Sequence, residues 1–472
     1  MRGIIWSFLN RCSNQVVMFA VSMVLARLLS PEDFGVIALA NVTIGLVTCF
    51  TNLGLGAALI QRTEVQELDY CTFFWADAVM RLLAYIVIYM IAPFAAEYYS
   101  KSELGILIRL LALGIPFGII SSVSGLKLTR AMDFKTPSVI SMVCCVVSSI
   151  VSIIMALRGY GLWTIVGQQL SVNVLVTLIT FCRVPWIPKF LFSWIRFRQF
   201  FSFGSKMLAS GILDTFYNDI ISIIIGKHFS LSSLGYFNKG QSIPQLLINS
   251  VNGPINGVSF PMLSKLQGDK VKYRAAFSRA LQTSVFFCTP MMAGMIVVAK
   301  PLIMLLFGEK WIPSVPFLQI MAIVCVLSPL HYLNLNAILA MGRSDIFLKL
   351  EVAKKIIAII IILVSIPFGL MAFIGSNILI SIVSLVINAY PLKSLLNYSL
   401  WQQIKDLSHT AEGSLVMLLL LFPLQWLPLS PYLIMTLQIP LGIVIYLVWS
   451  WVFSRQLFLS NLLLLRNIFL RR

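Results

Sequence analysis

Polar side chains interrupt the long apolar segments of this 472-residue chain at a limited number of positions. A charged side chain at the centre of a membrane helix costs about 2.5–3.5 kcal/mol, so it usually faces a cavity or a partner. Near the N-terminus Arg11, Asn14 and Gln15 are spaced i, i+3 and i+4 and would share one helix face. A guanidinium pairs with anions and amides hydrogen-bond hydroxyl groups, so this face could bind an anionic, hydroxyl-rich solute.

The first half of the chain has further polar positions inside apolar segments, namely Asn41, Asp77, Arg81 and Asn173. Asp77 and Arg81 are four residues apart and could pair within one helix, so a structural role and a binding role are both open. Arg11 has no acidic residue within one helical turn, which makes it the better candidate for meeting an anionic substrate. In the alternative interpretation, Arg11 extends to the cytoplasmic membrane surface from near the start of its helix.

The second half carries a similar set of polar residues: Asp214, Asn218, Asp219, Lys239, Asn249 and Asn252. Asp214 and Asn218 would share a helix face. Asp214 or Asp219 could bind a coupling proton or cation, or one of them could pair with Lys239 and hold neighbouring helices together. Residues 252–257 (NGPING) predict an interruption of the helix, which membrane proteins tolerate where the backbone lines protein or a cavity.

Motifs for catalysis are missing from the sequence. It contains no phosphate-binding loop of the Walker type, no metal-binding histidine motif and no nucleophile elbow. Only three histidines are present, and the eight cysteines show no metal-ligand spacing. We therefore predict no catalytic residue, no metal site and no cofactor, in a protein that is not an enzyme.

The helices that carry these residues can be predicted from composition. Hydrophobic residues make up 59% of the chain and charged residues 11%, whereas a soluble domain is about 25% charged. The composition predicts an all-α polytopic membrane protein with about fourteen transmembrane helices, each about 20 apolar residues long. They are expected near residues 7–29, 36–58, 72–97, 104–127, 138–157, 160–182, 202–227, 233–258, 276–299, 313–341, 346–370, 371–395, 412–429 and 432–454.

The formal net charge of +18 comes from short clusters of Lys and Arg between the apolar segments. This distribution indicates membrane topology rather than a nucleic-acid partner. With the N-terminus in the cytoplasm, 25 of these residues fall on the inside and 6 on the outside. Because cytoplasmic loops carry an excess of Lys and Arg, both termini are predicted to be cytoplasmic.

The chain contains an internal repeat. Residues 29–40 (LSPEDFGVIALA) have a degenerate copy at residues 229–240 (FSLSSLGYFNKG), and both predict a helix–turn–helix hairpin that begins with a serine. Two six-helix lobes around a polar cleft would suit a carrier that works by alternating access. The predicted parts are an N-terminal six-helix lobe (1–182), an interfacial elbow of basic and aromatic residues (183–200), a C-terminal six-helix lobe (201–395), two additional transmembrane helices (396–455) and an amphipathic cytoplasmic tail (456–472).

Four segments carry a resemblance to a known family: residues 25–40, 126–138, 235–269 and 305–322. Together they resemble the polysaccharide-exporting flippases of the multidrug/oligosaccharidyl-lipid/polysaccharide (MOP) exporter superfamily, especially the colanic-acid-exporter-like branch. The resemblance implies a bacterial inner-membrane transporter that moves an undecaprenyl-pyrophosphate-linked oligosaccharide from the cytoplasmic to the periplasmic leaflet. It also implies two MATE-like six-helix lobes and, in some family members, two further helices that form a groove for the lipid tail. Family members carry basic residues in the central cavity, and Arg11 matches one of these positions.

The implied partners are the lipid-linked oligosaccharide, the lipid bilayer, a glycan polymerase complex and a coupling ion, either H⁺ or Na⁺. A MATE-like cation-coupled exporter of small molecules or drugs is the alternative within the superfamily, and a cavity whose unpaired charge is Arg11 speaks against it. A membrane glycan polymerase or ligase is a further alternative. Such an enzyme usually carries a large periplasmic loop, and every loop predicted outside the membrane here is short.

Overall fold

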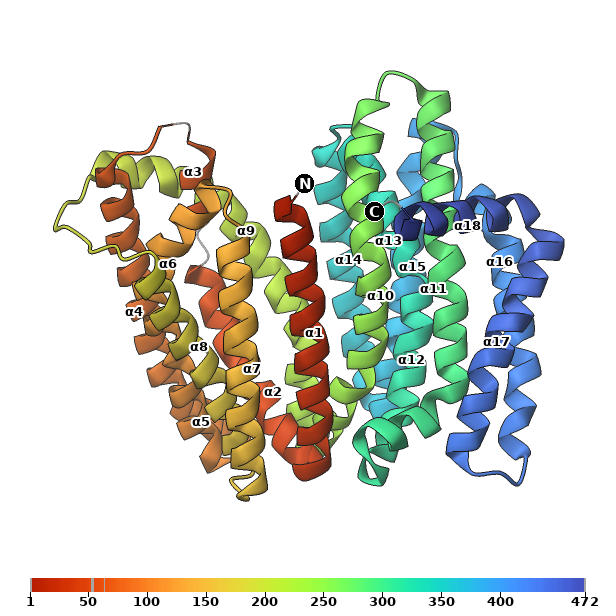
Figure 1. Ribbon diagram of the computed structural model, residues 1–472, viewed down its shortest axis with the longest axis horizontal. Helices are drawn as coiled ribbons and strands as arrows, with labels where there is room; N and C mark the ends of the chain where they lie inside the picture. Colours follow the sequence, from red (N-terminus) through yellow and green to blue (C-terminus); the bar gives the residue numbers. More distant parts are fainter. Residues whose placement is uncertain (1, 52–54, 63, 471–472) are drawn as a thin grey trace. The chain divides into compact units, whose positions relative to one another are not determined.

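The computed structural model describes the backbone of residues 2–51, 55–62 and 64–470. Side chains are described for the same residues except 2–13, 57–58, 61, 202–214, 218, 254, 256 and 464–470. The described residues form helices and no strand. The chain divides into two compact units, unit 1 (Met1–Gly235) and unit 2 (Tyr236–Arg472), which Figure 1 colours from red to green and from green to blue.

Unit 1 is built from long helices joined by short turns, and α7 packs along both α1 and α8 (Figure 1). Its described helices are α1 (Arg2–Leu28), α2 (Pro31–Thr48), η1 (Cys49–Thr51), α3 (Leu55–Gln61), α4 (Glu67–Tyr98), α5 (Ser102–Ala112), α6 (Gly114–Arg130), α7 (Lys135–Leu157), α8 (Trp163–Arg183), α9 (Trp194–Ile224) and the π-helical turn η2 (Ile225–Phe229).

Unit 2 is also built from long helices joined by short turns, and α11 packs against α12, α13, α16 and α17. Its described helices are α10 (Leu231–Lys265, which begins in unit 1), α11 (Lys270–Phe307), η3 (Glu309–Ser314), α12 (Val315–Val326), α13 (Ser328–Ala340), α14 (Ser344–Ser365), η4 (Ile366–Phe368), α15 (Leu370–Leu396), α16 (Leu400–Leu421), η5 (Phe422–Trp426), α17 (Pro431–Phe453) and α18 (Arg455–Leu470).

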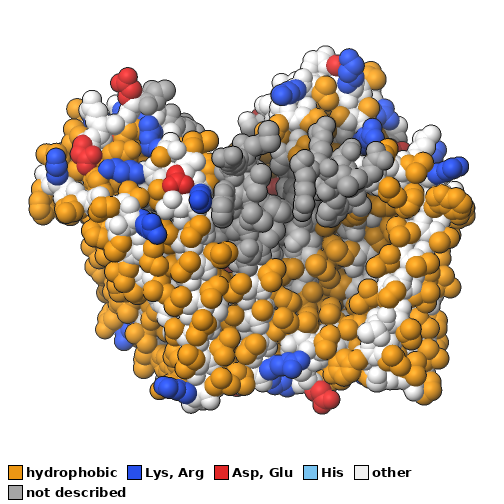
Figure 2. Space-filling view, in the orientation of Figure 1, with side chains coloured by type: hydrophobic (Ala, Val, Ile, Leu, Met, Phe, Trp, Pro, Cys, Tyr) orange, Lys and Arg blue, Asp and Glu red, His pale blue; other side chains and the backbone are white. Residues whose placement is uncertain are grey.

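The helices are long and apolar enough for a membrane. Within the described residues, ten helical segments have the length and composition to cross a bilayer, and α1 adds the shorter apolar stretch Asn14–Leu28. Each unit, taken by itself, shows hydrophobic side chains along its helices and charged ones near helix ends (Figure 2). The prediction of an all-α polytopic membrane protein is confirmed, while the count of fourteen spans stays a prediction.

Helix α4 illustrates how the membrane decides which face is buried. Val79, Leu83 and Phe94 are exposed on one face, while the carboxylate of Asp77 is buried on the other. Apolar residues gain nothing from leaving lipid, so the apolar face can stay outside. A carboxylate would lose its hydrogen bonds in lipid and therefore faces the protein.

One sequence expectation is wrong. Residues 252–257 were expected to interrupt a helix, but α10 runs unbroken from Leu231 to Lys265. A proline removes a single backbone donor, and neighbouring helices in a membrane protein compensate for such a loss. The NGPING run therefore lies within a continuous helix.

The division between the units lies after the predicted elbow (183–200). Helix α9 begins at Trp194, within that elbow, and packs against α2 and α3, which groups it with unit 1. The lobe boundaries deduced from the repeat stay a prediction. Hydropathy alone predicts where the chain enters lipid. It does not predict which helices pack against one another.

Both copies of the repeat begin a helix as predicted. The Ser30 hydroxyl accepts a hydrogen bond from the Asp33 amide at 3.2 Å, and the Asp33 carboxylate accepts one from the Ser30 amide at 2.8 Å. In the second copy the Ser233 amide donates to the Ser230 hydroxyl at 3.0 Å. These bonds satisfy amides that the first turn of a helix leaves unpaired. The helix–turn–helix prediction is confirmed at each position.

The glycines of the two copies make a close helix crossing. A Cβ at Gly35 would lie 1.9 Å from the carbonyl oxygen of Leu231, and a Cβ at Gly235 would lie 2.0 Å from that of Pro31. Only glycine allows backbones to approach so closely. The repeat therefore supplies two equivalent hairpins and also the two residues through which their helices cross.

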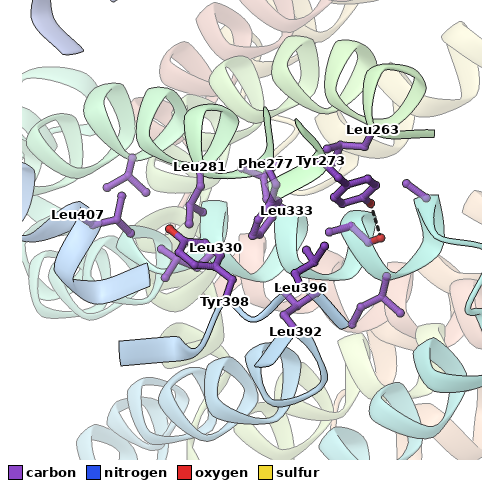
Figure 3. Packing of buried hydrophobic residues seen from close by; sticks show 14 of the residues in the cluster. Leu263, Tyr273, Phe277, Leu281, Leu330, Leu333, Leu392, Leu396, Tyr398 and Leu407 are labelled. Atoms are coloured by element: carbon purple, nitrogen blue, oxygen red, sulfur yellow. Dashed lines mark hydrogen bonds between the residues drawn. The ribbon is translucent and has the colours of Figure 1, made fainter. Parts of the chain in front are cut away.

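The core of unit 2 lies between α11, α13 and α15 (Figure 3). Phe277 and Leu281 of α11 pack with Leu333 of α13, and the Tyr273 hydroxyl donates a 2.6 Å hydrogen bond to the carbonyl of Ala337. A buried tyrosine needs such a partner for its hydroxyl group. This contact fixes the relative rotation of α11 and α13.

Candidate functional site

The polar face predicted on α1 reaches a second helix of unit 1. Asn14 Nδ2 donates a 2.7 Å hydrogen bond to Ser141 Oγ of α7, and Gln15 is half-buried. A hydrogen bond between helices in a membrane protein is worth about 0.6–2 kcal/mol. Asn14 therefore helps to hold α1 against α7. The side chain of Arg11 lies outside the described residues.

The carboxylate and guanidinium of α4 form the pair that their spacing allows. Arg81 Nε lies 2.8 Å from Asp77 Oδ2, and the Asp77 side chain is buried. A Cβ at Gly118 of α6 would lie 2.8 Å from Arg81 Nη1, so that glycine makes room for the guanidinium. The Asp77–Arg81 pair therefore lies between α4 and α6, in space that this glycine leaves open.

Asn173 and Asn41 differ in their surroundings. Asn173 of α8 packs on Gly114 of α6, where a Cβ would lie 2.2 Å from its Nδ2. Asn41 of α2 is exposed. Of the two, Asn41 is open to a solute, while Asn173 positions α8 against α6.

Asp219 of α9 is half-buried within unit 1, and a Cβ at Gly45 of α2 would make an ordinary 3.5 Å contact with its Oδ2. The same helix carries Asp214 and Asn218, whose side chains lie outside the described residues. These three positions therefore stay predicted site residues, of which the structure locates the side chain of Asp219 only.

Lys239 of α10 is buried in unit 2, with 7% of its surface exposed. Its Nζ lies 5.3 Å from the ring centre of Phe307 and 6.0 Å from that of Trp311. An ammonium group over aromatic rings gains roughly 0.5–2 kcal/mol of cation–π stabilisation. The surroundings of Lys239 in unit 2 are thus aromatic, which the sequence pattern did not indicate.

The two asparagines of α10 point to different environments. Asn252 is buried and its Oδ1 accepts a 3.0 Å hydrogen bond from Ser284 Oγ of α11. Asn249 is exposed. Asn252 therefore joins α10 to α11, and Asn249 is available to a hydroxyl-bearing solute.

Sequence reasoning missed an ionic group at the start of α4. The Asp69 carboxylate, whose side chain is 1% exposed, lies 2.6 Å from Arg62 Nη1 and 2.5 Å from Arg196 Nη1 of α9. Its Oδ2 also accepts from the Gln66 amide at 2.9 Å. The local signal was a carboxylate in a first helical turn, which indicates a cap but not its two distant partners.

The predicted elbow is attached to α4 and α6. Trp75 Nε1 donates to the Lys189 carbonyl at 3.0 Å, and Ser124 Oγ donates to the Val184 carbonyl at 2.8 Å. A cavity of about 460 Å³ lies here, and Phe190 in its lining is 92% exposed. Exposed aromatic rings beside cationic residues are typical of the lipid headgroup level.

Unit 2 contains an apolar cavity of about 470 Å³. Its lining comes from α10, α11, α16 and α17 and includes Leu247, Phe286, Met291, Met417, Ile443 and Tyr446. Gln438 of α17 is turned toward the protein, where its Nε2 donates to the Leu421 carbonyl at 3.1 Å. Such a surface can hold a hydrocarbon chain and has little to offer a sugar.

Three comparisons place these features among known proteins. A family model described as "Polysaccharide biosynthesis protein" matches residues 24–316. The succinoglycan biosynthesis transport protein ExoT of Rhizobium meliloti (strain 1021) is 29% identical over 68% of this chain and 65% of its own. The teichuronic acid biosynthesis protein TuaB of Bacillus subtilis (strain 168) is 29% identical over 62% of each chain.

A further relative is the lipopolysaccharide biosynthesis protein WzxC of Escherichia coli (strain K12), which is 24% identical over 71% of this chain and 69% of its own. The aligned part spans less than two thirds of ExoT and of TuaB. These names describe the relatives themselves.

Solved structures share the fold. The lipid II flippase MurJ, in an inward closed conformation, aligns with 96% of this chain and 99% of its own at a TM-score of 0.75 and 16% identity. An inward-facing multidrug resistance MATE transporter of the MOP superfamily aligns with 82% and 96% at a TM-score of 0.64 and 15% identity. The fold is therefore the polytopic helical fold of MurJ and MATE transporters.

Proposed function

Because the chain belongs to the polysaccharide biosynthesis protein family, we propose that it is a flippase and not an enzyme. Its substrate would be an undecaprenyl-pyrophosphate-linked oligosaccharide unit of an O-antigen, a capsule or an exopolysaccharide. It would move this unit from the cytoplasmic to the periplasmic leaflet of the bacterial inner membrane by alternating access. The family match is the observation that carries this proposal.

The apolar cavity of unit 2 gives physical support for a lipid substrate. In this proposal the polyprenyl chain occupies the cavity between α10, α11, α16 and α17, because that lining offers hydrocarbon and aromatic surface. The chain then stays in an apolar environment throughout the cycle. Only the pyrophosphate and sugars need a polar route, since each unsatisfied hydroxyl in hydrocarbon costs several kcal/mol.

Among the predicted site residues, we assign contact with the headgroup to those whose side chains are exposed or half-buried: Gln15, Asn41, Asp219 and Asn249. Asn14, Asp77, Arg81 and Asn252 have hydrogen-bond or ionic partners inside their own units, and Asn173 packs on Gly114, so these residues would position the helices that carry the contacting groups. Arg11 remains the proposed cation for the pyrophosphate. Asp214, Asn218 and Lys239 remain proposed site residues.

The orientation and partners are part of the same proposal. Both termini lie in the cytoplasm, because the Lys and Arg residues accumulate in the loops and tails on that side. The flipped unit is then delivered to a glycan polymerase complex. A coupling ion, H⁺ or Na⁺, supplies the driving force.

A flipping assay tests the proposal directly. Inverted membrane vesicles containing the protein are supplied with a fluorescent undecaprenyl-pyrophosphate oligosaccharide, and its disappearance from the outer leaflet is followed with an impermeant quencher. We expect protein-dependent loss of quenching, and in a deletion strain a build-up of lipid-linked units on the cytoplasmic leaflet. Unchanged surface glycan in the deletion strain, together with equal quenching in protein-free vesicles, would refute the function.

The MATE-like exporter is the second candidate, and the likeness to a MATE transporter keeps it under test. It predicts greater susceptibility of the deletion strain to cationic drugs, with lipid-linked units unchanged. The flippase proposal predicts the reverse pair of results. The same strain therefore separates the two.

A further inference from the structure

A polar group lies inside unit 2, between α13 and α15, and its central residue His331 is half-buried. His331 Nε2 is 2.9 Å from Ser381 Oγ, and His331 Nδ1 is 3.3 Å from Asn388 Nδ2. Ser381 and Asn388 are seven residues apart, two turns of one helix, so both face α13. Asn388 is fully buried. An imidazole thus has both of its nitrogens hydrogen-bonded to neutral side chains in a membrane-spanning unit.

The surroundings of this group are mainly apolar. Leu330 and Leu333, on either side of His331 in α13, and Leu385, between Ser381 and Asn388 in α15, belong to the hydrophobic core of unit 2. The sequence of α12 contains no charged residue. Arg279 of α11 and Lys393 of α15 are exposed.

Among the described residues, the charge that acts on the imidazole is Lys354 of α14, whose positive charge repels a proton on His331. Lys354 also forms a 2.5 Å ion pair with Glu351, which partly offsets this repulsion. As a pair, Lys354 and Glu351 have no net charge. A proton on His331 would therefore change the net charge of this part of the unit by one.

The asparagine has a hydrogen-bonding capacity that the structure does not use. Asn388 Oδ1 is buried and makes no hydrogen bond within the described residues. In the neutral ring, Asn388 Nδ2 donates to Nδ1, while Nε2–H donates to Ser381. A half-turn of the amide would bring Oδ1 to Nδ1, where it could accept from a protonated nitrogen. Both protonation states of the ring can then be fully hydrogen-bonded without moving a helix.

We propose that His331, held by Ser381 and Asn388, is the binding site for the coupling proton of the transport cycle. A proton from water forms a new N–H bond at Nδ1, and the amide of Asn388 turns so that Oδ1 accepts it. Ser381 continues to accept from Nε2–H. The inference rests on the proposed transport function and deepens it by naming the ion and its residues.

Adding one positive charge inside a membrane-spanning unit is costly, and the cost depends on how much water reaches the site. Two conformations that hydrate His331 differently would therefore differ in proton affinity, and proton binding would favour one of them. Asn334, one turn further along α13, is also buried, and both of its amide atoms lack partners among the described residues. Its amide offers a hydrogen-bonding position for a water molecule on the proton's route.

The composition of the chain allows a direct test. His228, His331 and His409 are its only histidines, so the double variant His228→Gln/His409→Gln retains His331 alone. With ¹⁵N-labelled histidine in lipid nanodiscs, we expect reversible conversion from imidazole to imidazolium as the pH falls from about 8 to about 4. In this background Asn388→Leu should move the midpoint to lower pH by about one unit, a tenfold weaker proton affinity.

The matched control is Asn377→Leu on the same helix, because within the described part of the chain the hydrogen bond of the Asn377 side chain goes to the carbonyl of Ile374 in its own turn. It should leave the midpoint unchanged. An imidazole that stays neutral at every pH at which the protein remains folded would overturn the inference. Equal effects of the two leucine variants would overturn the role of Asn388.

A transport measurement separates this inference from the proposed function. In the vesicle assay, an imposed proton gradient should accelerate flipping in the wild type and in Asn377→Leu, and His331→Gln should lose that acceleration. Stimulation by a sodium gradient alone, or an undiminished proton response in His331→Gln, would refute the proton site while leaving the flippase intact. If the wild type does not flip lipid under any gradient, the transport function fails, and the ¹⁵N spectra still decide whether His331 binds a proton.

Discussion

At the scale of single residues, the carboxylate of Asp69 shows how charge is accommodated at the start of a helix. It lies between the guanidinium groups of Arg62 and Arg196, and it also caps α4 through the Gln66 amide. Each arginine has a second partner, since Arg62 donates to Gln199 and Arg196 to Gln66. Asp69 therefore joins α4 to the start of α9.

Asp69→Asn should destabilise unit 1. The amide cannot balance two cations, so the guanidinium groups would repel each other, although both are partly exposed to solvent. We expect a loss on the order of 2 kcal/mol and a lower melting temperature. Asp345→Asn is the control, because the Arg343–Asp345 pair is exposed and such pairs contribute little. Equal melting temperatures for the two variants would contradict the role given to Asp69.

The turn between α6 and α7 should depend on pH through Asp133. Its carboxylate accepts from the Thr136 hydroxyl at 2.6 Å and from the Thr136 amide at 3.1 Å, and these bonds lower its pKa. The resulting stability is present above the unfolded pKa of about 3.9 and is lost as the pH falls through the folded pKa. Amide exchange at residues 134–136 should therefore quicken below about pH 4. In Asp133→Asn, exchange is expected to be fast already at neutral pH and to lack this acid-induced step.

At the scale of helices, the repeat produces a crossing that only glycine permits. Gly35 and Gly235 each face a backbone carbonyl of the other hairpin. A backbone oxygen cannot move aside as a flexible side chain can. Both copies of the motif therefore need a glycine at this position.

Gly35→Ala should force the helices α2 and α10 apart at this crossing. We expect a cost at the upper end of the roughly 1–3 kcal/mol typical of overpacking, seen as a lower melting temperature. Gly125→Ala in α6 is the matched control, because its Cβ would meet nothing within 4 Å and alanine favours a helix. A Gly35→Ala protein as stable as the wild type would show that the crossing tolerates a side chain.

The apolar cavity of unit 2 gives a second prediction at this scale. A Cβ at Gly294 of α11 would make an ordinary 3.8 Å contact with Met417, so larger atoms beyond it would enter the cavity. Gly294→Phe should slow flipping of an undecaprenyl substrate several-fold more than that of a short-chain analogue. Gly294→Ala should leave both rates near the wild type. An equal loss for both substrates would indicate a folding defect and not a blocked tail site.

At the scale of the whole molecule, the orientation in the membrane can be measured. In a cysteine-free background, Arg158→Cys should react with an impermeant maleimide added from the periplasmic side. Lys135→Cys should react only after the membrane is opened. Both side chains are exposed in the structure, so access is decided by the membrane alone. The opposite labelling pattern would reverse the predicted topology.

The sequence was sufficient to predict the helical segments of both units. Segments expected at 138–157 and 371–395 correspond to α7 (Lys135–Leu157) and α15 (Leu370–Leu396). Hydropathy succeeds because membrane insertion depends on a run of consecutive residues. The expectation that failed is the break at residues 252–257, which was based on glycine and proline and not on hydropathy. Packing against neighbouring helices outweighs the local cost of these residues.

The amino-acid sequence alone predicts local features: which segments are helical, where Ser30 and Ser230 begin a helix, and that Asp77 can reach Arg81 one turn away. The neighbouring helix that each polar face contacts is known only from the folded chain. Asn14 with Ser141, and His331 with Ser381 and Asn388, are separated by 50 or more residues in the chain. Helical periodicity shows which residues share a face, but core-facing and lipid-facing surfaces are equally apolar here, so no pattern in one segment identifies its partner in another.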